Sequence, residues 1–381
     1  MNKVLIIFLS LIWIWLSNVS TVFSQTTLAN KNYIMFFQNN SDGSTTVNVI
    51  DSNGIYSVTV LPSECYSFAI GEHVIGISQK QNPSSIRIID LKTSETIGEI
   101  RWKPEWVSPC AFGILADNSI FVRPDSENQE AIVFNINAVR DIKTVDLTQG
   151  MFIAGRFQKS SDLEPIYENI TNGAPFKVSP DTTANLILYY RCSAKFTRNE
   201  GCTGSSSFGI YDLSQNKEIT TLQATPFMRR DPVFDFGYSF HWSPRGNYIA
   251  YRSDYDSPGE RIIYDLKQNN YIDTSTIRSE AYRILDLTRW SPDETKIAML
   301  LVPLDESKAF GTAVGVFDLS TQQFEILPGL FEVRGDEWDW LPTSDGFALT
   351  LEESRLLRVD LQGSSEVIAQ NVDRISSTYN Q

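Results

Sequence analysis

Two aspartates that precede tryptophans at matching positions are the residues of this sequence with the clearest potential for catalysis. Asp286 lies four residues before Trp290, and Asp336 lies four residues before Trp340, with Glu337 directly after it. A pair of carboxylates can act as acid and base in the cleavage of a glycosidic bond if the fold brings the two groups together. The sequence therefore allows a hydrolase or lyase that uses these carboxylates, and the surrounding elements decide whether they meet.

A second group of carboxylates lies in polar stretches between predicted strands. Asp254, Asp256 and Glu260 share one such stretch, and Asp305 lies in the corresponding stretch of the next repeat. Calcium needs several oxygen ligands, but the spacing Asp254-x-Asp256-x-x-Gly259 lacks the regular intervals of a calcium loop. We therefore expect a solvated acidic rim without a metal or other cofactor, with a calcium site as the weaker alternative.

Other signals for catalysis are sparse. The chain has only two histidines, His73 and His241, which fall in separate predicted repeats. The sequence contains no G-x-S-x-G elbow, no H-E-x-x-H motif and no phosphate-binding loop. Arg229 and Arg230 form the one compact basic group, and the adjoining Asp231 could equally pair with them. On these grounds we favour a binding protein over an enzyme.

The four cysteines are an even number, as is typical of exported proteins with disulfides. Cys192 and Cys202 flank a short polar excursion, and Cys65 and Cys110 occupy similar places in successive repeats. Neither pair has the CxxC spacing or the neighbouring histidine of a zinc site. We predict the pairs Cys192–Cys202 and Cys65–Cys110 among the three possible pairings.

The start of the chain has the pattern of a secretory signal peptide. A lysine is followed by an apolar run at residues 4–16, and the tripeptide that ends at Ser24 fits the small-residue rule for cleavage. The apolar run is too short to span a bilayer comfortably, although an uncleaved anchor is the alternative. We predict a signal peptide at 1–24 and a secreted or periplasmic domain at 25–381, without stable membrane insertion after the leader is removed.

The composition argues against two classes of partner. Lys and Arg number 32 against 46 Asp and Glu, which gives a formal net charge of −14. Nucleic acids and anionic membranes bind clustered basic residues, and this sequence lacks such clusters. A hydrophobic content of 42% is ample for a large core, and the Gly and Pro residues are spread as in a turn-rich β protein. We therefore expect a protein or glycan partner and no nucleic acid.

Two recurring patterns predict the architecture. The first is an apolar strand that ends in Asp or Asn, followed by a polar turn and a second apolar strand. Its seven pivot residues are Asp51, Asp90, Asn135, Asp212, Asp265, Asp318 and Asp360. The second is an aromatic strand, a Ser-Pro-type turn and an apolar strand, with Trp242, Trp290 and Trp340 at intervals of 48 and 50 residues. Together they predict a four-stranded antiparallel blade whose tryptophans pack between blades.

The repeats from 174 to 369 resemble the WD-repeat-like β-propellers of the TolB type, whose repeats carry a W-S-P-D-G turn before an apolar strand. The stretch from Trp290 to Asp293 matches the first four letters of that turn, whereas Arg245 replaces the aspartate in the preceding copy. Residues 30–146 follow the pattern only in outline. The resemblance implies a fold and no activity, because such propellers serve as scaffolds, binding modules and parts of peptidases.

We predict a single all-β domain, a seven-bladed β-propeller of four-stranded antiparallel blades, with six blades as the alternative. The first repeat lacks an inner strand, and residues 372–379 remain after the last complete repeat. We expect this C-terminal segment to supply the missing strand, which would close the ring and remove exposed sheet edges.

The lengths of the loops predict where a partner binds. The Ser-Pro and Asp-Leu turns are short and lie on one face of such a disc, the turn face. The opposite, long-loop face carries the insertions and linkers, and long loops on a rigid scaffold are common recognition sites. The candidate binding residues on this face are Arg229, Arg230, Asp254, Asp256, Glu260, Asp286, Asp305, Asp336 and Glu337.

We favour a non-enzymatic exported β-propeller that binds a protein or glycan through the long-loop face. One alternative is a propeller hydrolase or lyase with carboxylates at the mouth of the channel. Another is a structural component of an envelope assembly, which rests on the TolB-type resemblance alone.

Overall fold

The fold consists of β-strands. In the computed structural model, the described residues run from 32 to 377, with gaps at 62–64, 71–73, 80–81, 91–92, 102–111, 115–118, 123–129, 136–137, 147–149, 154–155, 160–175, 181–185, 193–195, 198–200, 203–205, 223–239, 253–260 and 306–310. No helix occurs in these ranges, so none of them contains a helix long and apolar enough to cross a membrane. The predicted signal peptide at 1–24 lies outside the described residues.

Seven four-stranded antiparallel sheets account for most of these residues. Sheet 1 contains β1 (Ile34–Asn39), β2 (Thr45–Asp51), β3 (Gly54–Leu61) and β32 (Val372–Ser377). Sheet 2 contains β4 (Cys65–Ile70), β5 (Val74–Gln79), β6 (Asn82–Asp90) and β7 (Thr96–Arg101). Sheet 3 contains β8 (Phe112–Ile114), β9 (Ser119–Val122), β10 (Glu130–Asn135) and β11 (Ala138–Asp146).

The second half of the chain continues the same plan. Sheet 4 contains β14 (Phe176–Val178), β15 (Leu186–Cys192), β18 (Ser206–Asp212) and β19 (Lys217–Leu222). Sheet 5 contains β20 (Phe240–Trp242), β21 (Tyr248–Arg252), β22 (Arg261–Asp265) and β23 (Asn270–Ile272). Sheet 6 contains β24 (Tyr282–Trp290), β25 (Lys296–Pro303), β26 (Ala313–Asp318) and β27 (Gln323–Ile326). Sheet 7 contains β28 (Val333–Trp340), β29 (Gly346–Leu351), β30 (Leu356–Asp360) and β31 (Ser365–Ala369).

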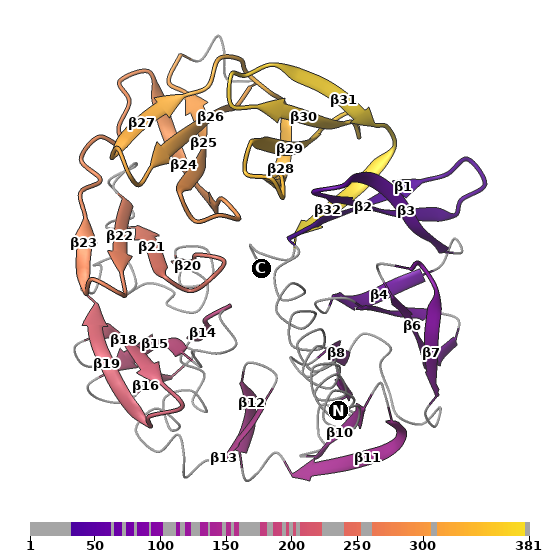
Figure 1. Cartoon of the computed structure of the whole chain (residues 1–381). Helices are drawn as coiled ribbons and strands as arrows, with labels where there is room; N and C mark the ends of the chain where they lie inside the picture. Colours follow the sequence, from indigo (N-terminus) through magenta and orange to yellow (C-terminus); the bar gives the residue numbers. More distant parts are fainter. Residues whose placement is uncertain are drawn as a thin grey trace, which may run out of the picture.

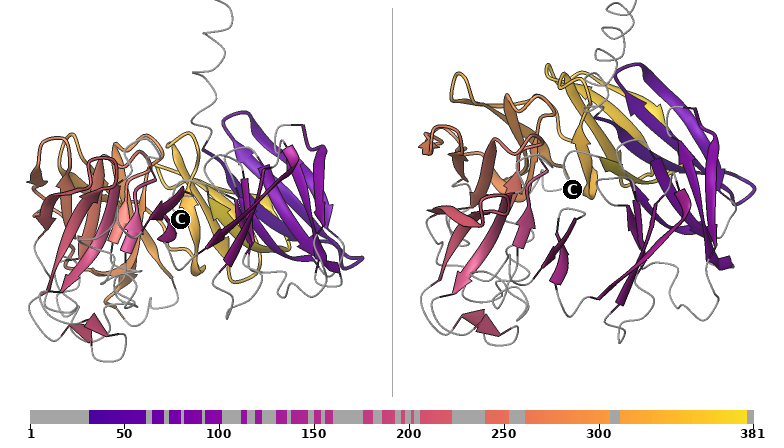
Figure 2. Two further views of the ribbon diagram at one scale, coloured as in Figure 1. Left: turned by 90° about the horizontal axis from the view of Figure 1, so that it is seen from below. Right: turned by 60° about the horizontal axis from the view of Figure 1, so that its bottom comes forward.

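The sheets stand side by side around a common centre in chain order, which is a β-propeller-like arrangement (Figure 1). Their strands run across the thickness of the molecule (Figure 2). Two short hairpins accompany them, β12 (Gly150–Ile153) with β13 (Arg156–Lys159), and β16 (Phe196–Thr197) with β17 (Gly201–Cys202). The hairpin β12–β13 lies between sheets 3 and 4 in Figure 1.

The C-terminal strand joins the N-terminal sheet, as the sequence predicts. Sheet 1 has the order β3-β2-β1-β32, and β32 pairs antiparallel with β1 from Ile34 opposite Ser377 to Gln38 opposite Val372. The C-terminal strand therefore supplies the inner strand that the first repeat lacks.

The aspartates that recur at the turns between the third and fourth strands of the sheets have a local structural role. The side chain of Asp318 accepts hydrogen bonds from the backbone N–H of Ser320 at 2.9 Å and of Thr321 at 3.0 Å. Asp212 and Asp265 make the same contacts in sheets 4 and 5. Such Asx turns fix the chain reversal, which explains why the pattern recurs along the sequence.

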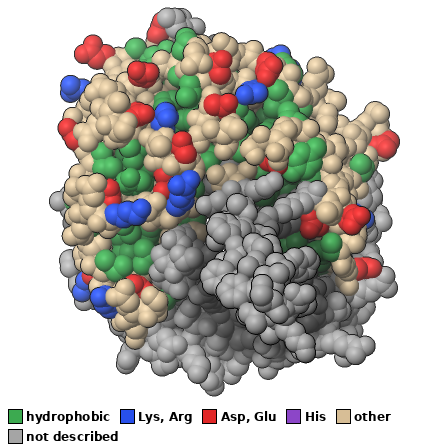
Figure 3. Space-filling view, viewed as in Figure 1, with side chains coloured by type: hydrophobic (Ala, Val, Ile, Leu, Met, Phe, Trp, Pro, Cys, Tyr) green, Lys and Arg blue, Asp and Glu red, His purple; other side chains and the backbone are tan. Residues whose placement is uncertain are grey.

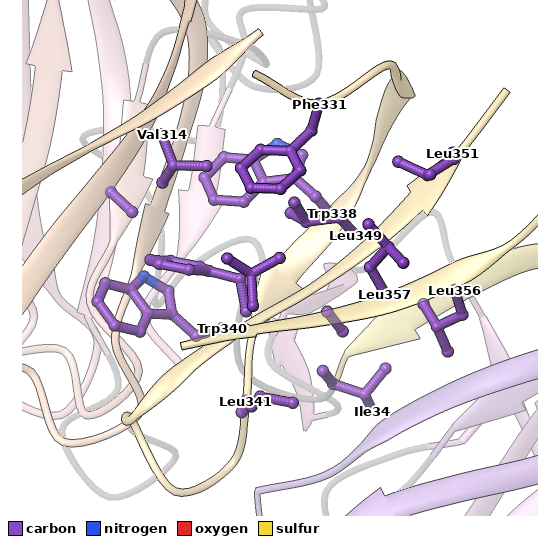
Figure 4. Packing of buried hydrophobic residues seen from close by; sticks show 14 of the residues in the cluster. Ile34, Val314, Phe331, Trp338, Trp340, Leu341, Leu349, Leu351, Leu356 and Leu357 are labelled. Carbon is purple, nitrogen blue, oxygen red and sulfur yellow. The ribbon is translucent and has the colours of Figure 1, made fainter. Parts of the chain in front are cut away.

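The hydrophobic core lies between sheets rather than within a single layer. One buried cluster joins Ala298 and Val314 of sheet 6 with Trp340 of sheet 7 and Ile34 of sheet 1 (Figure 4). Two others join sheet 4 to sheet 5 and sheet 5 to sheet 6. The predicted packing of the recurrent tryptophans between neighbouring sheets is therefore confirmed.

Each recurrent tryptophan also makes a polar contact with the preceding sheet. The indole N–H of Trp290 donates to the carbonyl of His241 at 3.1 Å, and that of Trp340 donates to the carbonyl of Arg289 at 3.0 Å. Trp242 donates to the carbonyl of Lys177 at the longer distance of 3.4 Å. The accepting carbonyl belongs in every case to the inner strand of the sheet before it, so the same contact repeats from sheet 4 to sheet 7.

Replacing Trp290 by Phe should lower the free energy of unfolding by about 2 kcal/mol, because the change removes the hydrogen bond to His241 and leaves unfilled volume. Trp290 is fully buried, so water cannot fill the volume that the smaller phenyl ring leaves. Denaturant unfolding of both proteins measures the difference. Ile219→Ala, at a side chain that is 46% exposed, is the control and should change the value by less than about 0.5 kcal/mol. Equal effects of the two changes would contradict the role assigned to the indole.

Candidate functional site

The turn face of sheets 5 to 7 is held by hydrogen bonds between successive turns. Glu294, in the Ser-Pro turn of sheet 6, accepts from the backbone N–H of Arg245 at 2.6 Å and from the side-chain amide of Asn247. In the same way, the hydroxyl of Ser344 in sheet 7 accepts from the backbone N–H of Asp293 at 3.2 Å. The side chains of Glu294 and Ser344 thus accept hydrogen bonds from the neighbouring turn.

The turns have a common backbone conformation that places these acceptors. Gly246, Glu294 and Ser344 occupy the same position in three turns, with φ values of 69°, 62° and 61°. This left-handed region favours glycine, so glutamate and serine occupy it at a cost of roughly 1 kcal/mol. The contact with the preceding turn offsets that cost.

Glu294→Gly removes the contact with Arg245 and Asn247 but also relieves the left-handed strain of roughly 1 kcal/mol, so it should lower the free energy of unfolding by only about 1 kcal/mol or less. Glu294→Ala should lower it by roughly 1 kcal/mol more, because alanine also strains the left-handed backbone. Denaturant unfolding compares the two variants. Asn371→Gly is the control, because Asn371 has a φ of 58° and is exposed. If Glu294→Gly is as stable as this control, the contact between turns contributes nothing.

Four ionisable residues occupy corresponding positions on the inner strands of sheets 4 to 7. They are the residues that directly precede Val178 and the three recurrent tryptophans, namely Lys177, His241, Arg289 and Asp339. The ammonium of Lys177 donates to the carbonyl of Phe240 at 2.6 Å. Lys and Arg side chains lie beside the centre of one face, and acidic side chains are spread over the rest of it (Figure 3).

Arg289 connects sheets 6 and 7. Its guanidinium carbon lies 5.8 Å from the centre of the Trp338 ring, and its Nε lies 3.9 Å from a carboxylate oxygen of Asp339. The side chains of Arg289 and Asp339 are 16% and 6% exposed. Sequence reasoning missed this row of residues because their spacing follows the tryptophans, which it interpreted as framework only.

Burial, together with the positive charge of Arg289, lowers the pKa of Lys177 from its ordinary value of 10.5 to about 8. Between these two pH values, the unfolded chain holds a proton at Lys177 that the folded chain has released. The free energy of unfolding should therefore rise with pH across this interval. Lys177→Met should not show this part of the rise, which denaturant unfolding at several pH values measures. Parallel pH profiles for the two proteins would contradict the lowered pKa.

The inner strands of sheets 6 and 7 bulge near the long-loop face. The pairing of β24 with β25 shifts register between Ile284 and Thr288, and that of β28 with β29 shifts between Val333 and Trp338. Bulges often occur beside functional sites, where they redirect side chains. Asp286 lies in the bulge of β24.

Asp336 lies in the bulge of β28, next to a described ion pair. The guanidinium of Arg334 lies 2.6 Å from a carboxylate oxygen of Glu337 and also donates to the carbonyl of Asp373 in the neighbouring strand β32. The side chains of Asp286 and Asp336 lie outside the described residues, so their role as a carboxylate pair stays a prediction. Glu337 is engaged by Arg334 within its own strand.

Two neighbouring arginines are buried at the long-loop end of sheet 5. Arg252 ends β21 and Arg261 begins β22, and the two are paired in register. Their exposed fractions are only 9% and 4%. Arg261 donates from Nη2 to the carbonyl of Leu285 at 2.7 Å and from Nε to the hydroxyl of Thr288 at 3.3 Å. It thereby contacts the bulged strand of sheet 6.

Arginines are unusual at this position of the repeat. In sheets 4, 6 and 7, the corresponding register pairs, all buried, are Tyr190–Phe208, Leu300–Val314 and Thr350–Leu356. Sheet 5 thus replaces an uncharged pair by two cations. The signal in the sequence is an arginine at the end of one apolar strand and at the start of the next, directly around the acidic stretch 253–260.

Most of the predicted binding residues are not tested by the described part of the chain. Arg229, Arg230, Asp254, Asp256 and Glu260 lie outside the described residues. Asp305 is exposed after β25 of sheet 6. The described ranges hold no group of three or more His, Cys, Asp or Glu side chains that could bind a metal.

The cysteine predictions have different outcomes. Cys192 and Cys202 form a disulfide with an S–S distance of 1.98 Å, which confirms the predicted clasp. For the pair Cys65–Cys110, Cys110 and the side chain of Cys65 lie outside the described residues, so this pairing stays a prediction.

Comparison with known proteins gives weak similarities. No protein-family model matches the sequence, and no curated protein matches it. Among solved structures, hydrazine synthase of Kuenenia stuttgartiensis is 14% identical, with a TM-score of 0.37 and coverage of 78% of this chain and 77% of that chain. The C-terminal WD40 domain of Sif2 is 11% identical, with a TM-score of 0.45 and coverage of 84% and 90%.

Dihydro-heme d1 dehydrogenase NirN in complex with DHE is a further similar structure. It is 10% identical, with a TM-score of 0.39 and coverage of 89% of this chain and 64% of that chain. Because the similarities are weak, the assignment of a β-propeller-like fold rests on the four-stranded sheets and their arrangement in this chain.

Proposed function

We propose that this chain is a non-enzymatic binding protein whose partner, a protein or a glycan, contacts the long-loop face and presents an acidic group to Arg252 and Arg261. The observation that carries the proposal is the replacement of a buried uncharged pair by two neighbouring arginines. A guanidinium binds a carboxylate through two parallel hydrogen bonds, which gives strength and orientation.

Stability alone is a poor reason for such a pair. Charged side chains lose hydration when they are buried, and replacing buried ionic groups by apolar ones is often neutral or stabilising. Leu300 and Val314 fill the corresponding position of sheet 6 without any charge. In the proposal, sheet 5 retains the two arginines for recognition in addition to the contacts that Arg261 makes with sheet 6.

Other cations extend the positive region along the inner strands. Arg261 donates a hydrogen bond to the hydroxyl of Thr288, and Arg289 is the next residue in the same strand. The positive charge of Arg289 also lowers the pKa of Lys177. The carboxylate of Asp339 lies 3.9 Å from Arg289 and offsets part of this charge. Such a region selects for acidic groups on a partner.

The proposal also covers the number of blades, the subfamily and the compartment of the protein. We infer seven blades, with β12–β13 as an insertion between the third and fourth, and a TolB-type subfamily on the basis of the Ser291-Pro292 turn. The Cys192–Cys202 disulfide supports an oxidising compartment, in keeping with secretion or export to a periplasm.

The double change Arg252→Leu with Arg261→Val tests the proposal, because it recreates the Leu300–Val314 pair of sheet 6. The unfolding free energy should fall by no more than about 2 kcal/mol, for the lost hydrogen bonds of Arg261 to Leu285 and Thr288, whereas affinity for the partner should fall by at least about tenfold, a loss of roughly 1.4 kcal/mol. Immobilised chain 25–381 is incubated with an extract of its source, the captured partner is identified, and its affinity is measured for each variant.

Arg278→Leu with Arg358→Leu is the matched control, because it removes two exposed arginines and the same net charge. This control should bind as the original protein does. Unchanged affinity in the Arg252/Arg261 variant would contradict the proposal. A loss of more than about 3 kcal/mol of stability in that variant would instead make the pair structural.

A further inference from the structure

The outer strand of sheet 1 offers an open edge for hydrogen bonding. β3 stands at the end of the order β3-β2-β1-β32, and no strand of the described chain pairs with its outer side. With eight residues, from Gly54 to Leu61, it is longer than β7, β19, β23, β27 and β31. Such an edge presents unpaired N–H and C=O groups to any extended chain that approaches it.

Charged residues or a short length protect the other outer strands, whereas β3 has neither. The sequence of β3 is GIYSVTVL, without a single ionisable acid or base other than its tyrosine. Proteins commonly place charges or short strands at sheet edges to prevent pairing with another molecule. The remaining outer strands follow this rule, because β23 has three residues and the others carry Glu99, Arg140, Glu218, Glu325 or Glu366.

The exposed face of β3 is apolar at two positions. Ile55 is 48% exposed and Val60 is 57% exposed. Ile55 is paired with Ile50 and Val60 with Thr46, two positions on the same face of β2, because a bulge near Val58 restores the alternation. Both side chains therefore project from one face of the sheet, while Tyr56 and Val58 pack into the core below.

The two exposed side chains are placed symmetrically in the strand. Ile55 is the second residue of β3 and Val60 is the second from its end. When two such strands pair antiparallel about a two-fold axis perpendicular to the sheet, residue 55 of one copy lies opposite residue 60 of the other. Each copy then contributes to two apolar cross-strand pairs, which stabilise an antiparallel edge.

We propose that β3 is a dimerisation edge, where two copies of this chain join sheet 1 to its counterpart in an antiparallel eight-stranded sheet. The absence of charged residues from β3 lets a second copy approach this edge. Each copy has a formal net charge of −14, and pairing through a charged outer strand would bring like charges together. The uncharged β3 edge avoids that repulsion, and its own sequence supplies the complementary apolar side chains.

Sedimentation of chain 25–381 at low to high micromolar concentration tests the proposal. The original protein should be a dimer at the upper end of this range, and Val60→Lys should weaken dimerisation at least about tenfold because it puts a charge opposite Ile55 in both cross-strand pairs. Ile219→Lys is the control, since Ile219 is also an exposed apolar residue of an outer strand, 46% exposed in β19. This control should dimerise as the original protein does.

A cross-linking experiment tests the register. A mixture of Ile55→Cys and Val60→Cys chains should cross-link through a short thiol-reactive linker, whereas Ile55→Cys alone should not, because the two copies of residue 55 lie at opposite ends of the paired strands. Circular dichroism verifies that each variant is folded. A monomer at every concentration, dimerisation of Val60→Lys equal to that of the control, or cross-linking of Ile55→Cys with itself would each overturn the proposal. Monomers that bind a different extended peptide at β3 would also overturn it in favour of a hetero-partner.

Discussion

The packing of one sheet against the next is the constraint on which the rest of this structure depends. No single sheet can bury its apolar residues alone, because the buried clusters join residues from neighbouring sheets. In sheets 5 to 7, the tryptophan of the inner strand fills the interface and hydrogen-bonds to the inner strand of the sheet before it. This contact fixes the distance between adjacent sheets and their relative position along the strands. Glu294 and Arg261 can therefore form hydrogen bonds with residues of a neighbouring sheet.

Much of the architecture could be predicted from the sequence because it depends on local chemistry. The pivot aspartates form Asx turns within their own hairpins, and the Ser-Pro turns place a tryptophan before a tight reversal. Both patterns involve residues that are close in the chain. The pairing of the C-terminal segment with β1 could also be predicted, because the first repeat lacks one strand.

The candidate site was less predictable because it depends on which residues face each other across an interface between sheets. Arg252 and Arg261 flank a polar stretch and look like the solvated ends of two strands, although both are buried. Glu294 looks like an ordinary turn residue, although it accepts hydrogen bonds from the preceding sheet. Both roles depend on the relative position of two neighbouring sheets, and the spacing of residues within one repeat does not predict that position.

The joining of β32 to β1 sets the order in which the molecule can be completed. The side chain of Gln38 donates to the carbonyl of Gln370, 332 residues further along the chain, at 3.0 Å. Contacts between such distant residues require that the entropy of a very long loop is overcome first, which slows folding. Sheet 1 therefore remains one strand short during synthesis. Until the last residues arrive, the inner edge of β1 is open to wrong partners, and a chaperone that covers this edge would protect the unfinished protein.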